Sequence, residues 1–229
     1  ATLRRQRQMC IRDSAETAKS IKDLVMNSDI LITCLPSPKI CAEVLESKDG
    51  IIDTIQKDQI WIEMSTTEDE QLKKHASLIQ QKNAIALEAP VSGGCHRAAT
   101  GNISIFVGGS REGFDKAMPV LKCLGRKILY TGDFGSASIL KVITNYLATV
   151  HLVALGEAWT IASKSNLDLN KTFKGIAASS GNSFVHETES QVILNGSYNI
   201  NFTMDLVEKD VGLFQDLASK LGIELEFHP

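Results

Sequence analysis

The chain has 229 residues, of which 43% are hydrophobic and 22% are charged, as in globular proteins that bury one or two cores. Its net charge of -3 gives no electrostatic reason to expect nucleic acid or an acidic membrane surface as a partner. The five cysteines are irregularly spaced without a C-x-x-C pair, and the five histidines are scattered, which argues against a disulfide framework and against a metal site. We therefore expect a reducing compartment, the cytoplasm or, in a eukaryote, the mitochondrial matrix.

The first residues are basic and lack the apolar core of a secretory signal. The string RRQRQMCIRDS resembles translated sequencing-adapter sequence, although arginines ahead of any acidic residue are also found in mitochondrial transit peptides. We expect residues 1–13 to be a non-native or disordered leader that carries no function.

Between residues 14 and 133, short apolar runs alternate with helical patterns. The predicted strands cover residues 29–35, 59–64, 83–88, 102–107 and 127–130. The predicted helices cover residues 15–26, 68–81, with Ser65 and Thr66 as candidate caps, and 112–124, which Gly125 ends. Strands and helices that alternate with short connections predict a mostly parallel, doubly wound α/β sheet of the Rossmann type.

The pattern becomes purely helical after residue 133. Residues 136–163 form one long predicted helix, and shorter helices are predicted at 169–177, 183–194 and 202–221. Lys141, Asn145, His151 and Glu157 interrupt the long helix, so it lacks the ~18 uncharged apolar residues of a membrane span. We expect a buried helix in an all-α domain at 134–229, a domain that the chain truncates, and no membrane partner.

A dinucleotide-binding domain normally opens with a strand and a G-x-G-x-x-G turn, whose backbone amides hold the pyrophosphate. No such turn precedes Ser28, so the predicted sheet begins at what would be the third or fourth strand of that fold. If residues 14–133 are a Rossmann-type domain, we expect it to be partial at its N-terminal end. We also expect the chain as written to bind a dinucleotide poorly or not at all.

Three short stretches carry groups suited to chemistry. The first is Glu88-Ala-Pro-Val-Ser-Gly-Gly94, where a predicted strand ends in a proline and two glycines. Backbone N–H groups exposed by the glycines, with the Ser92 hydroxyl, suit a carboxylate, which accepts several hydrogen bonds at once. An ordinary glycine turn is the alternative.

The second stretch is GSASILKVITNY, residues 135–146. Lys141 and Asn145 are four residues apart and therefore share one helix face, with the apolar Ile143, Leu147 and Val150 nearby in sequence. Apolar surroundings lower the pKa of a lysine and make it a proton donor and acceptor near neutral pH. The alternative is a lysine that extends from the edge of a buried helix to solvent.

The third stretch is VEKDVGL, residues 207–213. Lys209 and Asp210 are adjacent on a predicted amphipathic helix, and such a pair is most often part of a solvated face.

Taken in order, these stretches resemble the motifs of β-hydroxyacid dehydrogenases of the 3-hydroxyisobutyrate dehydrogenase type. EAPVSGG resembles their D/E-x-P-V-S-G-G substrate motif, GSASILKVITNY their G-x-G-x-x-x-K-x-x-N-N helix, and VEKDVGLFQDLASKLG their K-D-x-x-L-A helix. LITCLPSP and WIEMSTT resemble the V-I-T-M-L-P and D-M-S-T turns of the same family. Each motif is weak by itself, but five in order are specific, and they run from about residue 13 to the end.

The resemblance implies a substrate side and a reaction. Ser92, Gly93 and Gly94 are implied to bind the carboxylate of a small β-hydroxy acid. Lys141 is implied as the general acid/base and Asn145 as the residue that orients the substrate. In this family the hydroxyl proton passes to the lysine while a hydride passes to NAD or NADP.

The resemblance also implies a cofactor side. Lys209 and Asp210 are implied to lie near the nicotinamide, with Lys209 also near the substrate, and Leu35, Pro36 and Thr66 are implied to contact the cofactor. Family members form homo-oligomers, so a dimer or a tetramer is implied.

The chain departs from the family pattern at two positions, where Ala137 replaces the second glycine of G-x-G and Thr144 replaces the first asparagine of N-N. The first change affects packing at the helix start, and the second affects substrate contacts. Three alternatives remain. The first is a family member that has lost catalysis, although Lys141 is present, and the second is a helical interaction module on an α/β remnant. The third is a 6-phosphogluconate dehydrogenase, but the helical part of that enzyme is much longer than this one.

Overall fold

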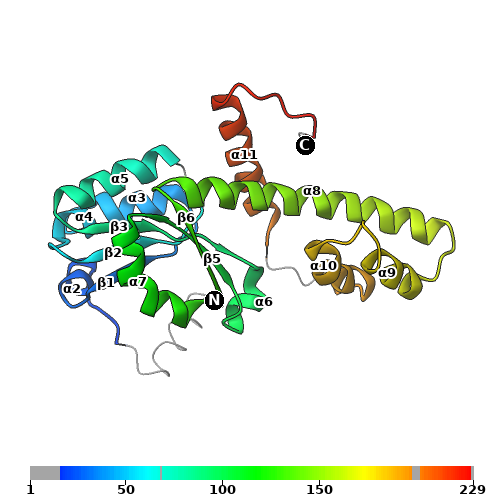
Figure 1. Cartoon of the computed structure of the whole chain (residues 1–229), viewed down its shortest axis with the longest axis horizontal. Helices are drawn as coiled ribbons and strands as arrows, with labels where there is room; N and C mark the ends of the chain where they lie inside the picture. The colour runs from blue at the N-terminus through cyan, green and yellow to red at the C-terminus, as the bar shows by residue number, and fades with distance from the viewer. Residues whose placement is uncertain (1–15, 68, 198–201, 228–229) are drawn as a thin grey trace.

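A computed structural model of the chain describes residues 16–67, 69–197 and 202–227 (Figure 1). The predicted leader, residues 1–13, lies outside this part of the chain. The strands are β1 (Ile30–Thr33), β2 (Ile60–Glu63), β3 (Ile85–Glu88), β4 (Val91–Ser92), β5 (Ser104–Gly109) and β6 (Lys127–Gly132). The helices of the α/β part are α2 (Ile21–Met26), α3 (Pro38–Glu46), α4 (Ile51–Thr54), α5 (Asp69–Gln81), α6 (Gly94–Ala99) and α7 (Arg111–Leu124).

The strands form one mostly parallel sheet, as predicted. β1, β2 and β3 are parallel neighbours, and β5 and β6 form a second parallel pair. β5 also pairs with β3 and with the two-residue strand β4, and it runs antiparallel to both. The register places Glu63 beside Glu88 at the carboxyl ends of β2 and β3, and Glu88 beside Gly108 of β5.

Helices cover both faces of the sheet because successive side chains of a strand point to opposite faces. Trp61 packs on one side with residues of α2 to α5, whereas Ile60 and Ile62 pack on the other side with Phe114 and Leu121 of α7. Every residue of β2 is buried, as expected for a strand covered on both faces. This arrangement confirms the doubly wound Rossmann-like class.

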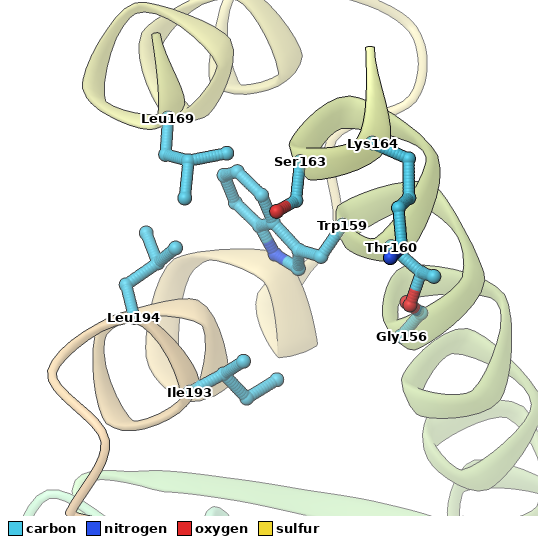
Figure 2. A pocket seen from close by; sticks show the side chains of 8 residues that line it. All are labelled: Gly156, Trp159, Thr160, Ser163, Lys164, Leu169, Ile193 and Leu194. Carbon is cyan, nitrogen blue, oxygen red and sulfur yellow. The ribbon is translucent and has the colours of Figure 1, made fainter. Parts of the chain in front are cut away.

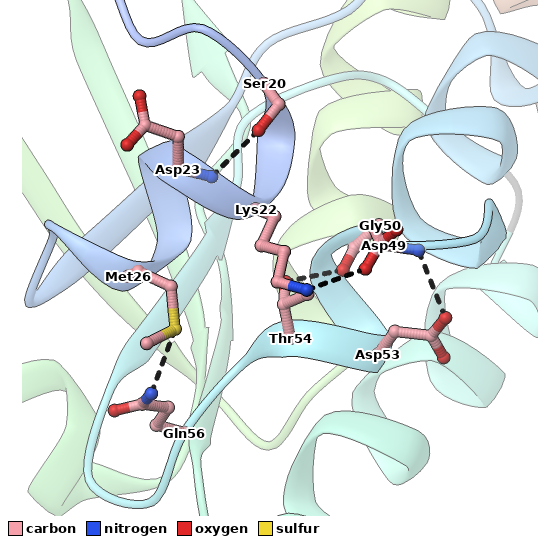
Figure 3. A network of polar contacts seen from close by, with 9 residues as sticks. All are labelled: Ser20, Lys22, Asp23, Met26, Asp49, Gly50, Asp53, Thr54 and Gln56. Carbon is pink, nitrogen blue, oxygen red and sulfur yellow. Dashed lines mark hydrogen bonds and ion pairs between the residues drawn. The ribbon is translucent and has the colours of Figure 1, made fainter.

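The α2 helix begins later than predicted. Ser20 has an extended backbone and its hydroxyl accepts a hydrogen bond from the Asp23 amide, so the helix starts at Ile21. Figure 3 shows how α2 is joined to the segment that follows α3: Lys22 pairs with Asp49, and the amide of Gln56 donates to the sulfur of Met26. These exposed contacts fix the position of α2 but add little stability.

Four elements of the α/β part were not predicted, namely α3, α4, β4 and α6. The α3 helix starts with Ser37 as its cap and Pro38 in its first turn, a common sequence signal for a helix start. The other three have two to six residues, too short for a periodic pattern.

The C-terminal part consists of α8 (Ser136–Lys164), α9 (Leu169–Ala177), α10 (Phe184–Leu194) and α11 (Met204–Lys220). The α8 helix has 29 residues and is therefore about 44 Å long. Figure 1 shows it leaving the sheet, with α9 and α10 along its second half and α11 against its first half. Leu155, Trp159, Ala162 and Val185 form a small core where α8 meets α10.

The prediction that α8 is buried is wrong for much of its surface. Val153 is 61% exposed and Ile161 is 67% exposed, because α9, α10 and α11 cover only part of the circumference. By length and composition alone α8 could also cross a membrane, a test that core helices of soluble proteins pass as well.

Candidate active site

A buried glutamate of the sheet caps the α8 helix. Glu88, the last residue of β3, is fully buried. Its Oε1 accepts hydrogen bonds from the amides of Gly135 (2.7 Å) and Ala137 (2.8 Å). Its Oε2 accepts from the amide (3.3 Å) and the hydroxyl (2.5 Å) of Ser138. Burial raises the pKa of Glu88, although these hydrogen bonds favour the carboxylate.

The space for this carboxylate depends on Gly108 of β5. A Cβ atom at position 108 would overlap Glu88 Oε1 and crowd the carbons behind it.

Ala137, which replaces a family glycine, is fully buried and supplies one of the four hydrogen bonds. The alanine is therefore accommodated at the helix start, where close packing was in question.

Lys141 lies about one turn beyond this cap and is only 9% exposed. Its Nζ donates to Oδ1 of Asn145 across 2.7 Å, and Nδ2 of Asn145 donates to Oδ2 of Asp210 in α11 across 2.5 Å. Burial lowers the pKa of Lys141 to about 8. The negative charge of Asp210 opposes this shift, and the positive charge of Lys209 adds to it.

The source of that burial differs from the prediction. Ile143 and Leu147, expected as apolar neighbours of Lys141, are 38% and 47% exposed. These residues are two and six positions along the helix from Lys141 and therefore point to other sides, so proximity in sequence did not place them around the lysine. The side chains that hydrogen-bond or charge-couple to Lys141 are Asn145, Asp210 and Lys209.

Lys209 joins α11 to the turn that follows β2. Its Nζ lies 2.9 Å from Oδ1 of Asp210 and donates to the backbone oxygen of Thr66 across 3.1 Å. Asp210 is 3% exposed, and its Oδ1 has an ion-pair contact but no aligned hydrogen bond among the described residues. The pair is therefore not the solvated surface pair that the sequence alone suggested.

The turns after β1 and β2 are bound to each other. The amide of Leu35 donates to the hydroxyl of Ser65 (2.7 Å), and the amide of Ser65 donates to Glu63 Oε1 (2.7 Å). Thr33 Oγ1 donates to Glu63 Oε2 (2.7 Å). The Ser65 hydroxyl, a predicted helix cap, thus accepts from the neighbouring turn. Burial raises the pKa of Glu63.

The glycine turn follows Glu88 by four to six residues. Gly93 and Gly94 both have positive φ (130° and 72°), a backbone conformation that glycine adopts without strain. The carbon chain of Arg97 lies against Gly93, and its guanidinium carbon lies 4.3 Å from the centre of the Phe184 ring in α10. The turn therefore faces the C-terminal part of the chain.

The predicted site residues fall into three groups. A continuous chain of polar contacts joins Lys141, Asn145, Asp210, Lys209 and Thr66. Leu35, followed by the exposed Pro36, adjoins this chain through Ser65. Ser92, Gly93 and Gly94 form the third group. They follow Glu88 in the sequence, and Glu88 accepts hydrogen bonds from the start of α8, the helix that carries Lys141. Sequence reasoning missed Glu88 and Glu63 because each appeared only as one letter of a motif; an acidic residue at the end of a predicted buried strand was the available signal.

A separate cavity of about 350 Å³ lies at the other end of α8. Figure 2 shows the Trp159 ring, Leu169 and Leu194 around it. Trp159 is 18 residues beyond Lys141 on the same helix, which is about 27 Å. The cavity is therefore remote from the polar chain around Lys141.

Comparison with known proteins identifies the family. Residues 2–132 match the family described as the NAD binding domain of 6-phosphogluconate dehydrogenase. Residues 135–228 match the family described as NAD-binding of NADP-dependent 3-hydroxyisobutyrate dehydrogenase. The chain belongs to the β-hydroxyacid dehydrogenase family. The resemblance drawn from five motifs is thereby confirmed, and the boundary between the two matches lies at the start of α8.

Individual relatives agree with this family membership. Mitochondrial 3-hydroxyisobutyrate dehydrogenase of Rattus norvegicus is 32% identical over 211 residues, covering 89% of this chain, which spans only 63% of that enzyme. 2-(Hydroxymethyl)glutarate dehydrogenase of Eubacterium barkeri is 30% identical, with 94% of this chain and 72% of that enzyme covered. The crystal structure of 3-hydroxyisobutyrate dehydrogenase from Salmonella typhimurium superimposes with a TM-score of 0.81 at 27% identity, covering 91% and 73% of the two chains.

Proposed function

We propose that the protein is an NAD(P)-dependent dehydrogenase that oxidises a small β-hydroxy acid or reduces the corresponding semialdehyde. The observation that carries this proposal is the buried Lys141, with a pKa lowered to about 8 and a hydrogen bond to Asn145. A lysine with such a pKa exchanges a proton near neutral pH, which an exposed lysine does not. The relatives named for 3-hydroxyisobutyrate and 2-(hydroxymethyl)glutarate support a β-hydroxy acid as the substrate class.

The proposed roles follow from the chemistry of each group. Neutral Lys141 accepts the proton of the substrate hydroxyl at Nζ, and in the reverse direction its ammonium returns that proton. Asn145 orients both the lysine and the substrate oxygen, and Asp210 holds the Asn145 amide in place. The backbone amides of the Ser92–Gly94 turn bind the substrate carboxylate, with Lys209 nearby. The nicotinamide supplies the hydride acceptor when it is bound.

The residues present fit the nicotinamide end of such a cofactor. The buried Asp210 Oδ1 lacks an aligned donor among the described residues and suits an amide N–H. The turns after β1 and β2 are joined to each other and contain Leu35, Pro36 and Thr66, and Lys209 donates to the backbone of Thr66. Ligands of open α/β sheets bind at this edge of the sheet. The described residues ahead of β1 include no glycine-rich turn for the pyrophosphate, so we assign only the nicotinamide half.

The exposed apolar side of α8 supports a homo-oligomer. Leu147, Val153 and Ile161 of α8 are 47–67% exposed. Exposed apolar side chains of this size often lie in an interface, and we propose a second copy of the chain as the partner, in a dimer or a tetramer. We further propose that the chain divides near residue 133 into an NAD(P)-binding domain and an all-α domain. We also propose that the protein is located in the cytoplasm or the mitochondrial matrix.

The test is a spectrophotometric assay on the full-length protein. The assay follows nicotinamide reduction with 3-hydroxyisobutyrate, 2-(hydroxymethyl)glutarate, glycerate and threonate, each with NAD and with NADP. We expect turnover with at least one acid and one cofactor. Absence of turnover across the panel, with a Lys141 that titrates as an ordinary lysine, would instead favour a non-catalytic family member or a helical interaction module.

A further inference from the structure

The two halves of the proposed substrate site are carried by different elements. The Ser92–Gly94 turn follows β3 and β4, whereas Lys141 is part of α8. Glu88 comes shortly before the first half in the sequence, and it is a hydrogen-bond partner of the helix that carries the second half. Ser92 comes four residues after Glu88, and Lys141 comes three residues after Ser138, whose amide and hydroxyl both donate to Glu88.

We propose that Glu88 is a positioning residue that holds the first turn of α8 against the end of β3 and so keeps Lys141 buried at a fixed place relative to the Ser92–Gly94 turn. Its catalytic consequence rests on the proposed acid/base role of Lys141. Glu88 itself does not touch substrate or cofactor in this proposal. It acts through the backbone of α8.

The first turn of α8 needs an external acceptor. The amides at the start of a helix have no partner within the helix, and their positive partial charge favours an anion. The cap residue of α8 is Gly135, which has a φ of 105° and no side chain to accept a hydrogen bond. The carboxylate of Glu88 accepts from Gly135, Ala137 and Ser138 instead. The anchor of this helix therefore comes from the sheet and not from the helix itself.

The carboxylate has little freedom to move. Glu88 is fully buried between β3, β5 and α8, and Gly108 is its neighbour in the register. The missing side chain of Gly108 provides the space that Oε1 occupies. Closely packed surroundings on one side and four hydrogen bonds on the other leave one position for α8 relative to the sheet.

The charge of Glu88 is not what tunes Lys141. The pKa of Lys141 is lowered by burial and by Lys209 and raised by Asp210, and Glu88 is not among these causes. A substitution at position 88 therefore reaches Lys141 through its position and its burial. This separates a positioning role from direct electrostatic coupling and from a purely stabilising role.

The test measures the titration of Lys141 in the chain itself, without substrate or cofactor. Competitive labelling with a trace amine reagent between pH 6 and 11, read by mass spectrometry, gives the pKa of each lysine. We expect about 8 for Lys141 in the native chain. In Glu88→Gln and Glu88→Ala we expect a rise toward the ordinary value of 10.5, because the loosened helix start admits water to the lysine.

Glu63→Gln is the matched control. Glu63 is also buried, ends the neighbouring strand and has a raised pKa, but it bonds to Thr33 and Ser65 and not to α8. We expect Glu63→Gln to leave the Lys141 titration where it is. A Lys141 pKa that stays near 8 or falls in both Glu88 variants, measured below their unfolding temperature, would overturn the proposal.

Milder variants cover the case in which Glu88→Ala does not fold. Ser138→Ala removes only the hydroxyl contact, and Gly108→Ala displaces the carboxylate without altering it. Both are expected to raise the pKa of Lys141 in the same direction, and no change in either would count against the proposal. If the native lysine titrates near 8 while no β-hydroxy acid is turned over, the proposed function fails and the positioning of Lys141 by Glu88 still stands.

Discussion

Asn145 connects the buried ammonium of Lys141 to the buried carboxylate of Asp210, accepting from the first across 2.7 Å and donating to the second across 2.5 Å. An amide can do both at once, because its oxygen accepts and its nitrogen donates. The arrangement fixes which way the amide points and separates the two charges by one side chain. Lys141 is thus oriented without a direct ion pair that would keep it permanently protonated.

Replacing Lys141 distinguishes proton transfer from simple attraction of the substrate carboxylate. In the active protein we expect Lys141→Ala to lower turnover by roughly 10²–10⁴-fold, the range of a positioned acid/base, with cofactor affinity almost unchanged. Lys141→Arg is expected to be nearly as damaging, since arginine keeps the charge but does not release a proton at working pH. Steady-state kinetics on both variants provide the measurement. If Lys141→Arg retained most of the activity, only an electrostatic role would remain.

The pH dependence should differ between the two directions of the reaction. Oxidation needs the neutral amine, so its rate should rise with pH through about 8, the pKa of Lys141. Reduction needs the ammonium, so its rate should fall through the same region. Profiles of kcat/KM in both directions report this pKa for the free enzyme. Parallel profiles in the two directions would exclude Lys141 as the titrating group.

The two charges beside Lys141 should shift its pKa in opposite directions. Asp210→Asn removes the charge that raises the pKa, so the rise in the oxidation rate should move to lower pH. Lys209→Met removes the charge that lowers it, so the rise should move to higher pH. Amine labelling of Lys141 in each variant checks the result independently of activity. Shifts of the same sign in both variants would show that reorganisation, and not charge, dominates.

Burial of Lys141 should reduce stability in a defined pH range. Its folded-state pKa of about 8 lies below the ordinary 10.5, so the unfolded chain binds the extra proton between these values. Stability therefore rises as pH increases from about 8 toward 10.5, and the full cost, roughly 3 kcal/mol at most, applies below about pH 8. Lys141→Met should gain stability in urea unfolding at pH 7, and the gain should shrink at pH 10.

Lys171→Met serves as the control for that comparison. Lys171 is a lysine of α9 that is exposed to solvent, so folding does not bury its charge. Its substitution is expected to change the free energy of unfolding by about 0.5 kcal/mol or less at either pH. A gain for Lys141→Met that stayed constant between pH 7 and pH 10 would contradict the desolvation explanation.

The sequence predicts elements with strong periodicity and misses those defined by tertiary contacts. The α7, α9 and α10 helices start and end within a residue of the prediction, because capping residues such as Ser183 and Gly125 mark their ends. The antiparallel pairing of β5 with β3 leaves no local signal, since strand direction depends on the connecting path. The exposure of α8 is likewise set by which helices pack on it.

The proposed site shows the same division. Lys141 and Asn145 could be paired from their spacing alone, and the Lys209–Asp210 pair could be found only by its resemblance to a family motif. The hydrogen bond between Asn145 and Asp210 joins residues 65 positions apart, so no sequence pattern predicts it. Glu88 reaches α8 across 47 to 50 residues for the same reason.

The fit between Glu88 and Gly108 has an evolutionary consequence. The glutamate needs a residue without a side chain at its register partner, whereas aspartate, one methylene shorter, frees room beside that position. We therefore expect the two positions to co-vary among descendants of this chain, with larger residues at 108 appearing only after 88 has shortened. Substitutions made in the opposite order should pass through a less stable intermediate, so that the order of mutations, and not only their sum, is constrained.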